Sequence, residues 1–582
     1  MINQIIPKKK VYKNKTYNGI KIMEEDTYIT CSNCNKEILQ SDLLEGRNVC
    51  PNCEYHHKLK ATDRIKWLCD DDSFKEIDQY MTQADPLNFE GYQEKLLFDK
   101  KKTSLNEAII CGEATINDEK CILAVMESDF RMGSMGTIVG QKIFNAAKLA
   151  CKLKQPFVIY TCSGGARMQE GVWSLMQMAK TLEAFEMLNK AGLLSVVVLT
   201  NPTTGGVSAS FATAADIVIA EPKAIVGFAG RKVIANTIKE ELPEDFQTAE
   251  FLMKNGHIDD IVSRLEQKQY LTMLMKLFKA EQIDKKNHFS NCVTKLPFIK
   301  ENSDSKGLTK AMDSLKIVRQ MDRPSTLDYI SYLFEDFVEL HGDRMTSDDP
   351  AMITGVGFFH DRPVTVIGHQ RGKDYSDNLK RNFGMPSPAG FRKARRIIEQ
   401  SMKFNRPIIT FVDTKGADPT AQAEMLNQSE AISQCTRQML VADVPILSIV
   451  IGEGGSGGAL AISTGNKLLM LKNAVFSVIS PEGAASILWK NSQLVEKAAE
   501  NLKITAQDLA DFGIADGVIP EIDSDASSNV KKQAKIIDYY ILKSLDELIQ
   551  LNKEQIIEQR FNKYTTIGAH DSNKREEIKA NV

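Results

Sequence analysis

The chain alternates short apolar runs with longer stretches in which apolar residues recur every three or four positions. One example begins with PFVIY at 156–160, continues through the adjacent glycines Gly164 and Gly165, and then shows helical spacing. The helical positions are Met168, Val172, Leu175, Met176 and Ala179. An apolar run bounded by turn residues is typical of a buried strand, and the spacing that follows is typical of a helix. We therefore predict a strand, a glycine turn and a helix.

This pattern occurs twice, because segments of the first half have counterparts 251 or 252 positions later. The pairs are PFVIYTCSGGAR at 156–167 with PIITFVDTKGAD at 407–418, TNPTTGGVSAS at 200–210 with GEGGSGGALAI at 452–462, and DIVIAEPKAIVGF at 216–228 with KLLMLKNAVFSVI at 467–479. Strands that alternate with helices favour an α/β architecture. We predict two α/β domains of one fold in tandem.

Composition shifts divide the chain further. A polar stretch, KENSDSKG at 300–307, separates the two repeats, and the residues after 550 are rich in Lys, Glu, Gln and Asn. Polar segments with few large apolar residues are typical of linkers and solvated tails. The predicted divisions are 1–60, 61–290, a linker over 291–324, 325–545, and a polar tail over 546–582.

Four cysteines near the start form two closely spaced pairs. CSNC at 31–34 and CPNC at 50–53 give the spacing C-x2-C-x15-C-x2-C. Two such knuckles can place four thiolates tetrahedrally around Zn²⁺. His56 and His57 follow closely, but four cysteines already complete a structural site. The spacing predicts a zinc ribbon with the ligands Cys31, Cys34, Cys50 and Cys53.

Glycine turns after apolar runs recur at repeat-related positions. Glycine lets the backbone approach a ligand closely, and amide N–H groups freed at a helix start can bind phosphate or an oxyanion. A single glycine pair is more simply a tight turn, but four turns at matching places favour an amide site. The candidates are Gly164, Gly165, Gly205, Gly206, Gly416, Ala417, Gly457 and Gly458.

Two familiar glycine motifs fit less well. Residues 452–457 spell G-x-G-x-x-G, but Gly465 interrupts the stretch that follows, and no acidic residue ends the next apolar run. Residues 454–458 spell G-x-S-x-G, yet only His570 of the eight histidines follows Ser456. Oxyanion sites without an adjacent nucleophile or base suit enolate chemistry, in which a second substrate brings the base.

Composition excludes other classes of protein. The 582 residues are 43% hydrophobic with a net charge of −3, which does not indicate a general polyanion binder. No run approaches the roughly 18 apolar residues of a membrane helix, and the start lacks an export signal. The 11 cysteines are mostly scattered, as is typical of reduced thiols. We predict a cytoplasmic protein with no membrane segment.

Long strings of the sequence resemble the carboxyltransferase component of bacterial-type acetyl-CoA carboxylase. The first half resembles its β subunit, and the second half its α subunit. The strings are MESDFRMGSMGTIVGQKI, SGGARMQEGVWSLMQMAKT, TNPTTGGVSASFATAADIVIAEPKAIVGFAG and LPEDFQTAEFL in the first half, and RPSTLDYI, HGDRM, GHQRGKD, RNFGMPSPAGFRKARR, IGEGGSGGALAI and SVISPEGAASILWK in the second.

This resemblance implies two crotonase-like (ClpP/crotonase) ββα-spiral domains behind the zinc ribbon. It also implies transfer of CO₂ from carboxybiotin, held on a biotin carboxyl carrier protein that biotin carboxylase serves, to acetyl-CoA. The product would be malonyl-CoA, the committed precursor of fatty acid synthesis. The first-half amides would serve acetyl-CoA and the second-half amides biotin. A homodimer or larger homo-oligomer is expected.

Three features depart from the family. Its two subunits share one chain here, and the helical segment that opens the α subunit is shortened to the linker. Its motif D-T-P-G-A, followed by an aromatic residue and P-G, reads DTKGADPT at 413–420. Lys415 replaces proline, Asp418 an aromatic residue and Thr420 glycine. These changes affect the expected biotin pocket, whereas Gly416 and Ala417 are retained.

Three questions stay open at the level of sequence. Propionyl-CoA carboxylation, or decarboxylation of a malonyl-type thioester, would use the same fold. Weak nucleic-acid binding by the ribbon is an alternative role, because residues 1–68 carry 12 basic and 8 acidic side chains. Candidates for the CoA phosphates are Arg167, Arg231, Arg371 and Lys373, each of which is also explained as a solvated surface charge.

Overall fold

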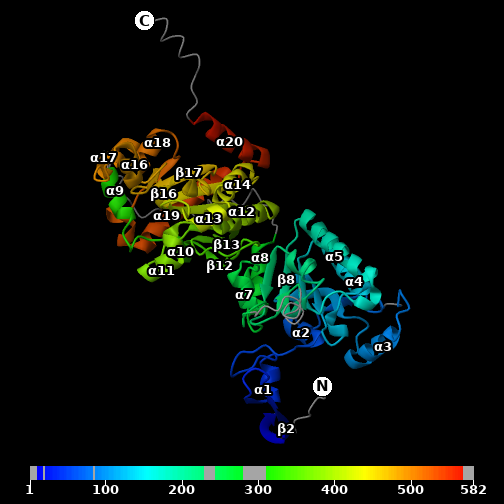
Figure 1. Cartoon of the computed structure of the whole chain (residues 1–582). Coiled ribbons are helices and arrows are strands. Elements are labelled where there is room, and N and C mark those ends of the chain that lie inside the picture. The colour runs from blue at the N-terminus through cyan, green and yellow to red at the C-terminus, as the bar shows by residue number, and fades with distance from the viewer. Residues whose placement is uncertain (1–9, 18–19, 83–84, 229–242, 280–309, 568–582) are drawn as a thin grey trace, which may run out of the picture. The chain divides into compact units, whose positions relative to one another are not determined.

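The computed structural model describes residues 10–17, 20–82, 85–228, 243–279 and 310–567. The chain forms two compact units (Figure 1). Unit 1 comprises residues 1–254 and 258–279, and unit 2 comprises residues 255–257 and 280–582. Each unit contains its own large sheet, so the predicted tandem arrangement corresponds to two separately packed cores.

The sheet of unit 1 is mixed, with strand order β11-β9-β8-β7-β6-β5-β4. Its strands are β4 (Lys75–Ile77), β5 (Ile109–Ile116), β6 (Glu119–Met126), β7 (Phe157–Ser163), β8 (Ser195–Thr204), β9 (Ile217–Ala220), β11 (Asp260–Ile261), and β10 (Val226–Gly227), which pairs with β8. A tight turn at Asn117 and Asp118, both with positive φ, joins β5 to β6. From β6 to β11 the pairing is parallel.

Unit 2 repeats this topology, with strand order β12-β13-β14-β15-β16-β17-β19. Its strands are β12 (Glu335–Glu339), β13 (Met352–Phe359), β14 (Arg362–His369), β15 (Ile408–Thr414), β16 (Ile446–Gly455), β17 (Lys467–Leu471), β19 (Gly517–Ile519), and β18 (Val475–Ser477), which pairs with β16. Strands β14 to β17 correspond to β6 to β9 in order and direction. The internal repeat read from the sequence is confirmed.

Helices cover the parallel strands, which are buried on both faces. The helices of unit 1 beyond the ribbon are α2 (Ala61–Leu68), α3 (Tyr92–Thr103), α4 (Thr137–Leu153), α5 (Val172–Lys190), α7 (Ala249–Lys254) and α8 (Gln267–Leu277). Those of unit 2 are α9 (Ala311–Val318), α10 (Thr326–Leu333), α11 (Tyr375–Lys380), α12 (Pro388–Lys403), α13 (Ala421–Met425), α14 (Gln428–Val441), α15 (Ser456–Leu460), α16 (Pro481–Leu488), α17 (Val495–Leu502), α18 (Ala506–Asp511), α19 (Val530–Leu548) and α20 (Lys553–Thr566). Every residue of β7 and of β15 is buried, which explains their continuous apolar character.

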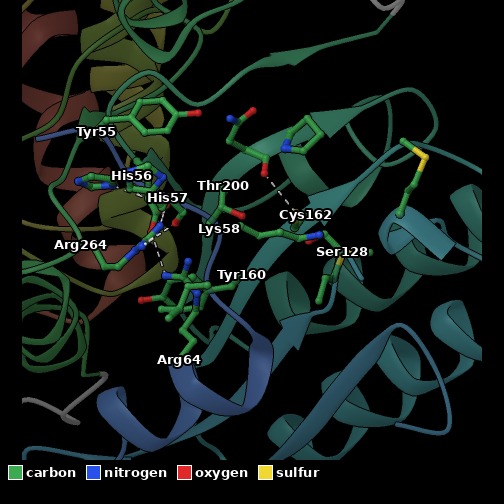
Figure 2. A pocket seen from close by; sticks show the side chains of 16 residues that line it. Tyr55, His56, His57, Lys58, Arg64, Ser128, Tyr160, Cys162, Thr200 and Arg264 are labelled. Atoms are coloured by element: carbon green, nitrogen blue, oxygen red, sulfur yellow. Dashed lines mark hydrogen bonds and ion pairs between the residues drawn. The ribbon is translucent and has the colours of Figure 1, made fainter. Parts of the chain in front are cut away.

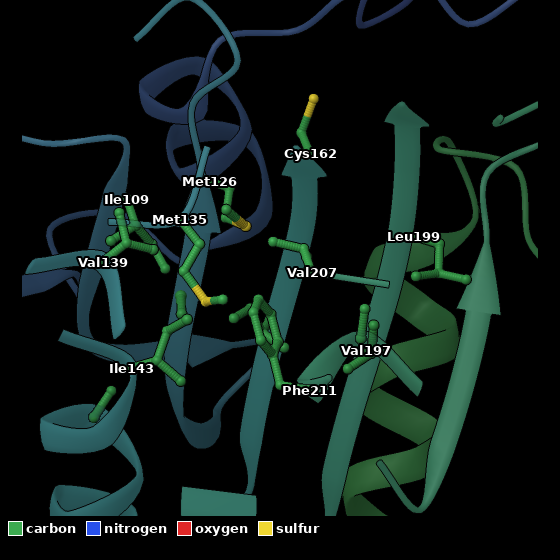
Figure 3. Close-up of a cluster of buried hydrophobic side chains, with 14 of the residues drawn as sticks. Ile109, Met126, Met135, Val139, Ile143, Cys162, Val197, Leu199, Val207 and Phe211 are labelled. Atoms are coloured by element: carbon green, nitrogen blue, oxygen red, sulfur yellow. The ribbon is translucent and has the colours of Figure 1, made fainter. Parts of the chain in front are cut away.

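The core of unit 1 lies between its sheet and helix α4 (Figure 3). Val139 and Ile143 of α4 pack with Val197 of β8 and with Phe211, and all four side chains are 0% exposed. Burying a side chain of this size contributes roughly 1.5–3 kcal/mol. This core holds the carboxyl ends of β7 and β8, where the predicted glycine turns lie, on a rigid base.

The N-terminal segment forms a small sheet of its own. It consists of β1 (Lys10–Tyr17), β2 (Ile20–Thr30) and β3 (Glu37–Leu39), followed by helix α1 (Gln40–Glu45). Ile38 and Leu43 are the large aliphatic side chains buried beside its cysteines. Such a small core cannot stabilise a domain unaided, so the cysteine cluster has to contribute.

Two segments differ from the expected linker and tail. Residues 311–318 of the predicted linker form α9, whose Leu315 and Val318 are buried against Val475 and Ile504. In the predicted polar tail, α20 buries Ile556 and Arg560. Both segments therefore belong to the packed unit 2, because each helix buries side chains that lie one turn apart on one face. The rest of the predicted linker up to residue 309 lies outside the described residues.

Helix α5 forms where the sequence predicts a helix, but its expected apolar side is exposed. Leu175 and Met176 are 51% and 53% exposed, and Trp173 is 54% exposed. The core is reached instead by Ala184, Phe185 and Leu188. Spacing thus predicted the helix correctly without indicating which part of it is buried. In the described part of the chain, none of the helices is both long and apolar enough to cross a bilayer.

Candidate active site

The two glycine turns of each unit meet because one strand carries extra residues. In unit 1, Thr161 of β7 pairs with Leu199 of β8, but Ser163 already pairs with Thr203. Unit 2 repeats this irregularity: Val412 pairs with Val450, and Thr414 with Gly454. A bulge bends a strand and redirects the residues beyond it. Here it brings the turn after the longer strand against the turn after its neighbour.

In unit 1 the two turns touch through their backbones. A Cβ on Gly205, whose φ is +64°, would lie 3.0 Å from Cα of Gly165, and one on Gly165, whose φ is +113°, would lie 3.4 Å from the nitrogen of Gly206. Both glycines adopt left-handed backbone conformations that other residues rarely tolerate. The glycine character of these positions is therefore required by the turn itself.

Most of the predicted amide donors of unit 1 are already engaged. The N–H of Gly164 donates to Met132 O at 2.9 Å, and that of Gly165 donates to Ser163 Oγ at 3.0 Å. The N–H of Gly205 donates to the carbonyls of Gly227 and Phe228. These internal bonds do not fit the predicted role of Gly164, Gly165 and Gly205 as ligand donors. The three residues shape the turn instead.

Two neighbouring amides of unit 1 remain available. Within the described residues, the N–H groups of Ala166 and Gly206 donate to no acceptor. They lie close together, because a Cβ on Gly206 would be 3.4 Å from the nitrogen of Ala166. Gly206 was predicted, whereas Ala166, the counterpart of the predicted Ala417 in the other repeat, was not. Paired free N–H groups of this kind can bind one oxygen atom.

Unit 2 has a corresponding pair. The N–H of Gly416 is occupied by Thr414 Oγ1 at 3.1 Å, whereas that of Ala417 donates to no group of the described chain. A Cβ on Gly458 would lie only 2.5 Å from the nitrogen of Ala417. Gly457 and Gly458 belong to the first turn of α15, whose leading N–H groups have no acceptor within the helix. Ala417 and Gly458 thus match Ala166 and Gly206.

Arg167 follows Ala166, and its side chain is held in a buried network of ion pairs. Its guanidinium is 0% exposed and binds both oxygens of Glu107, at 2.6 and 2.9 Å, as well as Glu170 at 3.2 Å. The hydroxyl of Tyr92 donates to Glu170 at 2.6 Å. Burial by itself would lower the pKa of Arg167, but the two carboxylates, Glu107 before Glu170, raise it above its ordinary value.

This network corrects the prediction that Arg167 contacts a CoA phosphate. Its nitrogens face buried carboxylates and the carbonyl of Ser134 at 2.9 Å, not solvent. The second oxygen of Glu170 accepts from the N–H and hydroxyl of Thr137, which ties the start of α4 to the same group. Arg167 is therefore a positioning residue that fixes the backbone carrying the Ala166 amide.

Removing the hydroxyl of Tyr92 tests this network. We expect Tyr92→Phe to lower the free energy of unfolding of unit 1 by about 1–3 kcal/mol, because a buried hydrogen bond to charged groups is lost. Tyr329 of unit 2 is a matched control, since its equally buried hydroxyl has no partner among the described residues. Tyr329→Phe should be neutral or stabilising. Equal melting temperatures for the two variants would contradict the role assigned to Tyr92.

The four predicted cysteines form one cluster. Their sulfur atoms all lie within 4.8 Å of one another, with Cys31 and Cys53 at 3.8 Å and Cys34 and Cys50 at 3.9 Å. A tetrahedral site with Zn–S bonds of about 2.3 Å requires sulfur separations of about 3.8 Å. The cluster is therefore compatible with a zinc ion, and neither His56 nor His57 belongs to it.

A cavity of about 290 Å³ lies where the ribbon meets the sheet of unit 1 (Figure 2). Its walls include the stretch 55–59 of the ribbon side and, from the sheet, Tyr160, Cys162 and Thr200. The cavity is thus open at the carboxyl ends of β7 and β8, the same ends that carry the amide pair of unit 1. Met132 also lines the cavity, and its carbonyl accepts from Gly164 of the first glycine turn.

One buried carboxylate joins the ribbon to the sheet. Glu221 binds Arg64 at 2.9 Å and Arg264 at 2.6 and 2.9 Å. Arg264 also donates to the carbonyls of Arg47 and His57, at 2.8 and 2.9 Å. Burial raises the pKa of Glu221, but Arg64 and Arg264 outweigh it and hold the pKa well below its usual range. The carboxylate stays charged and positions the ribbon over the cavity.

Of the other predicted phosphate contacts, Arg371 and Lys373 are placed in unit 2. Arg231 lies outside the described residues. Arg371 and Lys373 line a cavity of unit 2 and bind Asp413 and Asp328. The cavity of unit 1 instead offers Lys58, a half-exposed cation bound to Asp129 at 2.6 Å. Lys58 gave no sequence signal, because a lysine after a ribbon is ordinarily a surface charge.

A buried histidine lies beneath the amide pair of unit 2. His369 ends β14, is 0% exposed and accepts a hydrogen bond on Nδ1 from the N–H of Asp413 at 3.3 Å. Burial lowers the pKa of His369 to about 3. Its imidazole is therefore neutral and a very weak base at ordinary pH. His369 therefore cannot serve as a strong general base beside the amide pair of unit 2.

A solved structure defines the fold class. The fold matches that of transcarboxylase 12S, whose crystal structure is a hexamer with methylmalonyl-coenzyme A bound. The TM-score is 0.66 and the sequence identity 20%, and the match covers 85% of this chain and 90% of that one. At such low identity the match establishes the α/β carboxyltransferase fold.

Sequence relatives identify the family. The acetyl-coenzyme A carboxylase carboxyl transferase subunits beta/alpha of Clostridium tetani are 45% identical over 93% of both chains. The alpha subunit of Listeria monocytogenes is 52% identical over 53% of this chain and 96% of its own. The profile "Acetyl co-enzyme A carboxylase carboxyltransferase-like" matches residues 257–568. The chain belongs to the acetyl-CoA carboxylase carboxyl transferase subunits beta/alpha, which confirms the family resemblance.

The chain is therefore the carboxyltransferase component of acetyl-CoA carboxylase, an enzyme of fatty acid biosynthesis. The β-type and α-type parts occupy one chain here, as they do in the Clostridium tetani relative, whereas the Listeria monocytogenes relative is an alpha subunit alone.

Proposed function

We propose that each unit stabilises the oxygen of one substrate with its own amide pair. Ala166 and Gly206 would receive the thioester oxygen of acetyl-CoA, and Ala417 and Gly458 the ureido oxygen of biotin. The observation that carries this proposal is the recurrence of two free, adjacent N–H groups at repeat-related positions. Turns that served only to reverse the chain would not need to leave the same pair unbonded twice.

The first pair would act on the enolate of acetyl-CoA. Removing a proton from the methyl group places negative charge on the thioester oxygen, and two preset donors stabilise it. Losing one such donor typically costs about 3 kcal/mol. The network of Arg167, Glu107 and Glu170 would keep the Ala166 amide in place without itself touching the substrate.

The second pair would act on the donor. Carboxybiotin supplies CO₂. After the CO₂ has left, the ureido nitrogen of biotin can take the proton from the methyl group of acetyl-CoA. The amides of Ala417 and Gly458 would stabilise the negative charge on the ureido oxygen during this step. The neutral His369 fits this division of labour, because the base then comes from the donor and not from the protein. The enolate carbon attacks CO₂ and gives malonyl-CoA.

The experiment is carboxylation of free biotin by the purified chain with malonyl-CoA as the donor. We expect acetyl-CoA to form only when both substrates are present, because the reaction is the reverse of the proposed one. Propionyl-CoA and acetyl-CoA are compared as acceptors in the forward direction to test the alternative acyl substrates. Release of CO₂ from malonyl-CoA without biotin would instead favour a decarboxylase.

The remaining site proposals concern the ribbon. We propose one Zn²⁺ per chain, held by Cys31, Cys34, Cys50 and Cys53, whose sulfur spacing fits a tetrahedral ion. We also propose that the cavity beneath the ribbon receives part of the acyl-CoA, with Lys58 near its phosphates and the ribbon as a lid. Its volume and its opening at the carboxyl ends of β7 and β8 support this assignment.

The partners are proposed by analogy with relatives. The biotin would be carried by a biotin carboxyl carrier protein and recharged by biotin carboxylase, in the cytoplasm. Each domain would follow the crotonase-like ββα spiral. A homo-oligomer is supported by the hexamer of transcarboxylase 12S and by the exposed Trp173, Leu175 and Met176 of α5. Sedimentation of the active chain as a monomer would contradict it.

A second role in weak nucleic-acid binding rests on the basic excess of the ribbon region. A Zn²⁺ ion with four thiolates has a net charge of −2, which offsets part of the excess of 12 basic over 8 acidic side chains in residues 1–68. The remaining positive patch is small. Any binding should therefore be weak and fall steeply as salt increases.

A further inference from the structure

Unit 2 contains a cationic cavity beside its amide pair. The cavity has a volume of about 260 Å³ and is lined by five basic side chains and no carboxylate. The basic residues are Arg319, Arg323, Arg371, Lys373 and Lys415. Lys415 immediately precedes Gly416 and Ala417, so the cavity borders the backbone that carries the second amide pair. An anion is the ligand that such a lining favours.

Four of these five cations are already paired. Bonds of 2.6–2.9 Å join Arg319 to Glu453 and Glu482, Arg323 to Glu521, and Arg371 to Asp413. Lys373 binds Asp328. These acids lie behind the cavity wall, since none of them lines it. The paired cations are therefore largely neutralised and mainly shape the wall.

Lys415 is different, because its side chain is exposed and its ammonium binds no carboxylate of the described chain. Its field is felt by Glu482, whose pKa burial raises but Arg319, and to a lesser degree Lys415, lower. Glu482 is itself engaged by Arg319 at 2.6 Å. The ammonium of Lys415 is thus the group of this lining that is free to bind a ligand anion.

The backbone of Lys415 is held firmly although its side chain is free. A Cβ on Gly455 would lie 2.1 Å from the carbonyl oxygen of Lys415, so the two turns are in direct contact there. β15 ends at Thr414, whose Oγ1 accepts from the N–H of Gly416. A side chain anchored on such a fixed backbone can reach the cavity and the space in front of the Ala417 amide without moving the turn.

We propose that Lys415 binds the carboxylate of the carboxyl donor in this cavity. The inference rests on the function proposed above and adds a residue that the family pattern does not provide, because the family has proline at this position. The carboxylate attached to the ureido nitrogen is an anion until CO₂ leaves. An ammonium beside it forms a charge-assisted hydrogen bond and orients the donor against the amides of Ala417 and Gly458.

The test measures carboxyl transfer from malonyl-CoA to biotin methyl ester by the full chain. The ester is used because the side-chain carboxylate of free biotin could itself bind Lys415. We expect Lys415→Met to lower kcat/KM for the ester about tenfold, as for the loss of one charge-assisted hydrogen bond. The KM for malonyl-CoA should stay within twofold. Lys415→Arg should recover most of the activity, because it restores the positive charge.

The matched control is Lys531→Met, an exposed lysine of α19 that does not line the cavity. It should behave as the unmodified chain. Unchanged ester kinetics in Lys415→Met would overturn the proposal, as would a raised KM for malonyl-CoA, which would place Lys415 at the CoA phosphates. Equal losses in the Met and Arg variants would also overturn it. An inactive unmodified chain would instead refute the proposed function itself.

Discussion

Replacing Gly458 with valine should lower turnover at least about 100-fold and weaken binding of biotin while acyl-CoA binding is retained. Even a Cβ at this position would lie 2.5 Å from the nitrogen of Ala417 and 2.7 Å from the carbonyl carbon of Gly416. Backbone atoms cannot yield as a flexible side chain does, so the Ala417 amide must move. A displaced donor costs a few kcal/mol, which corresponds to about two orders of magnitude in rate.

Gly206→Val should have the opposite selectivity. Its Cβ would lie 3.2 Å from the Cβ of Ala166 and 3.4 Å from the nitrogen of Ala166, and the γ-methyls of valine would extend this crowding. The φ of Gly206 is not in the left-handed region, so the effect comes from contact and not from backbone strain. We expect turnover to fall at least about 100-fold with weaker acyl-CoA binding and nearly unchanged biotin binding.

Binding constants for both ligands and melting temperatures of both variants are the measurements. Gly517→Val is the control, because Gly517 starts strand β19, where valine is well tolerated, and its Cβ would meet only the side chain of Leu469 at 3.3 Å. The control should show any change in stability without selectivity between ligands. If Gly458→Val and Gly206→Val lost both ligands equally, in proportion to lost stability, the two-site mechanism would be refuted.

Cys50→Ser should abolish metal binding and unfold the ribbon. Cys50 is 0% exposed and lies 3.9 Å from Cys34, so serine would leave three thiolates and a poor fourth ligand. The apolar core of the ribbon, built around Ile38 and Leu43, is too small to fold without the metal. We expect about one zinc per unmodified chain by elemental analysis, none in the variant, and rapid proteolysis of the first roughly 60 residues.

The rest of unit 1 should remain folded in Cys50→Ser. Arg264 would lose its bonds to the carbonyls of Arg47 and His57, but Glu221 would still be held by Arg64 and Arg264 within the sheet domain. Cys151→Ser is the control, since Cys151 of α4 lies outside the cluster. Freshly purified chain without zinc, or a variant that keeps full zinc, would contradict the site.

Local pattern was sufficient for several features of this protein. The cysteine spacing identified the four clustered sulfurs, because two knuckles of fixed geometry each supply two of the four sulfurs of one tetrahedral site. Continuous apolar runs identified β7 and β15, because parallel strands buried on both faces have no polar side. The 251-residue offset identified the repeat, since related segments preserve their order of strands and turns.

Which N–H groups are left without an acceptor depends on contacts between segments that are far apart in the chain. Gly164 and Gly205 lie in the same kind of glycine turn as Gly206. The N–H of Gly164 nevertheless donates to Met132 O, and that of Gly205 donates to the carbonyls of Gly227 and Phe228. The free N–H of Ala166 lies beside Gly206 because the extra residues in β8 bring the two turns together. No local signal records which carbonyl will lie opposite a given amide.

Burial and pairing of charges were likewise settled by packing. Arg167 reads as an available cation in the sequence, but Glu107, which is 60 positions away, meets it inside the protein. Lys415, in a similar glycine context, has no such partner in the described chain and faces a cavity. A side chain's charge is encoded at its own position, whereas the groups that neutralise or expose it are brought together by folding, because the sheet joins strands that are far apart in the chain.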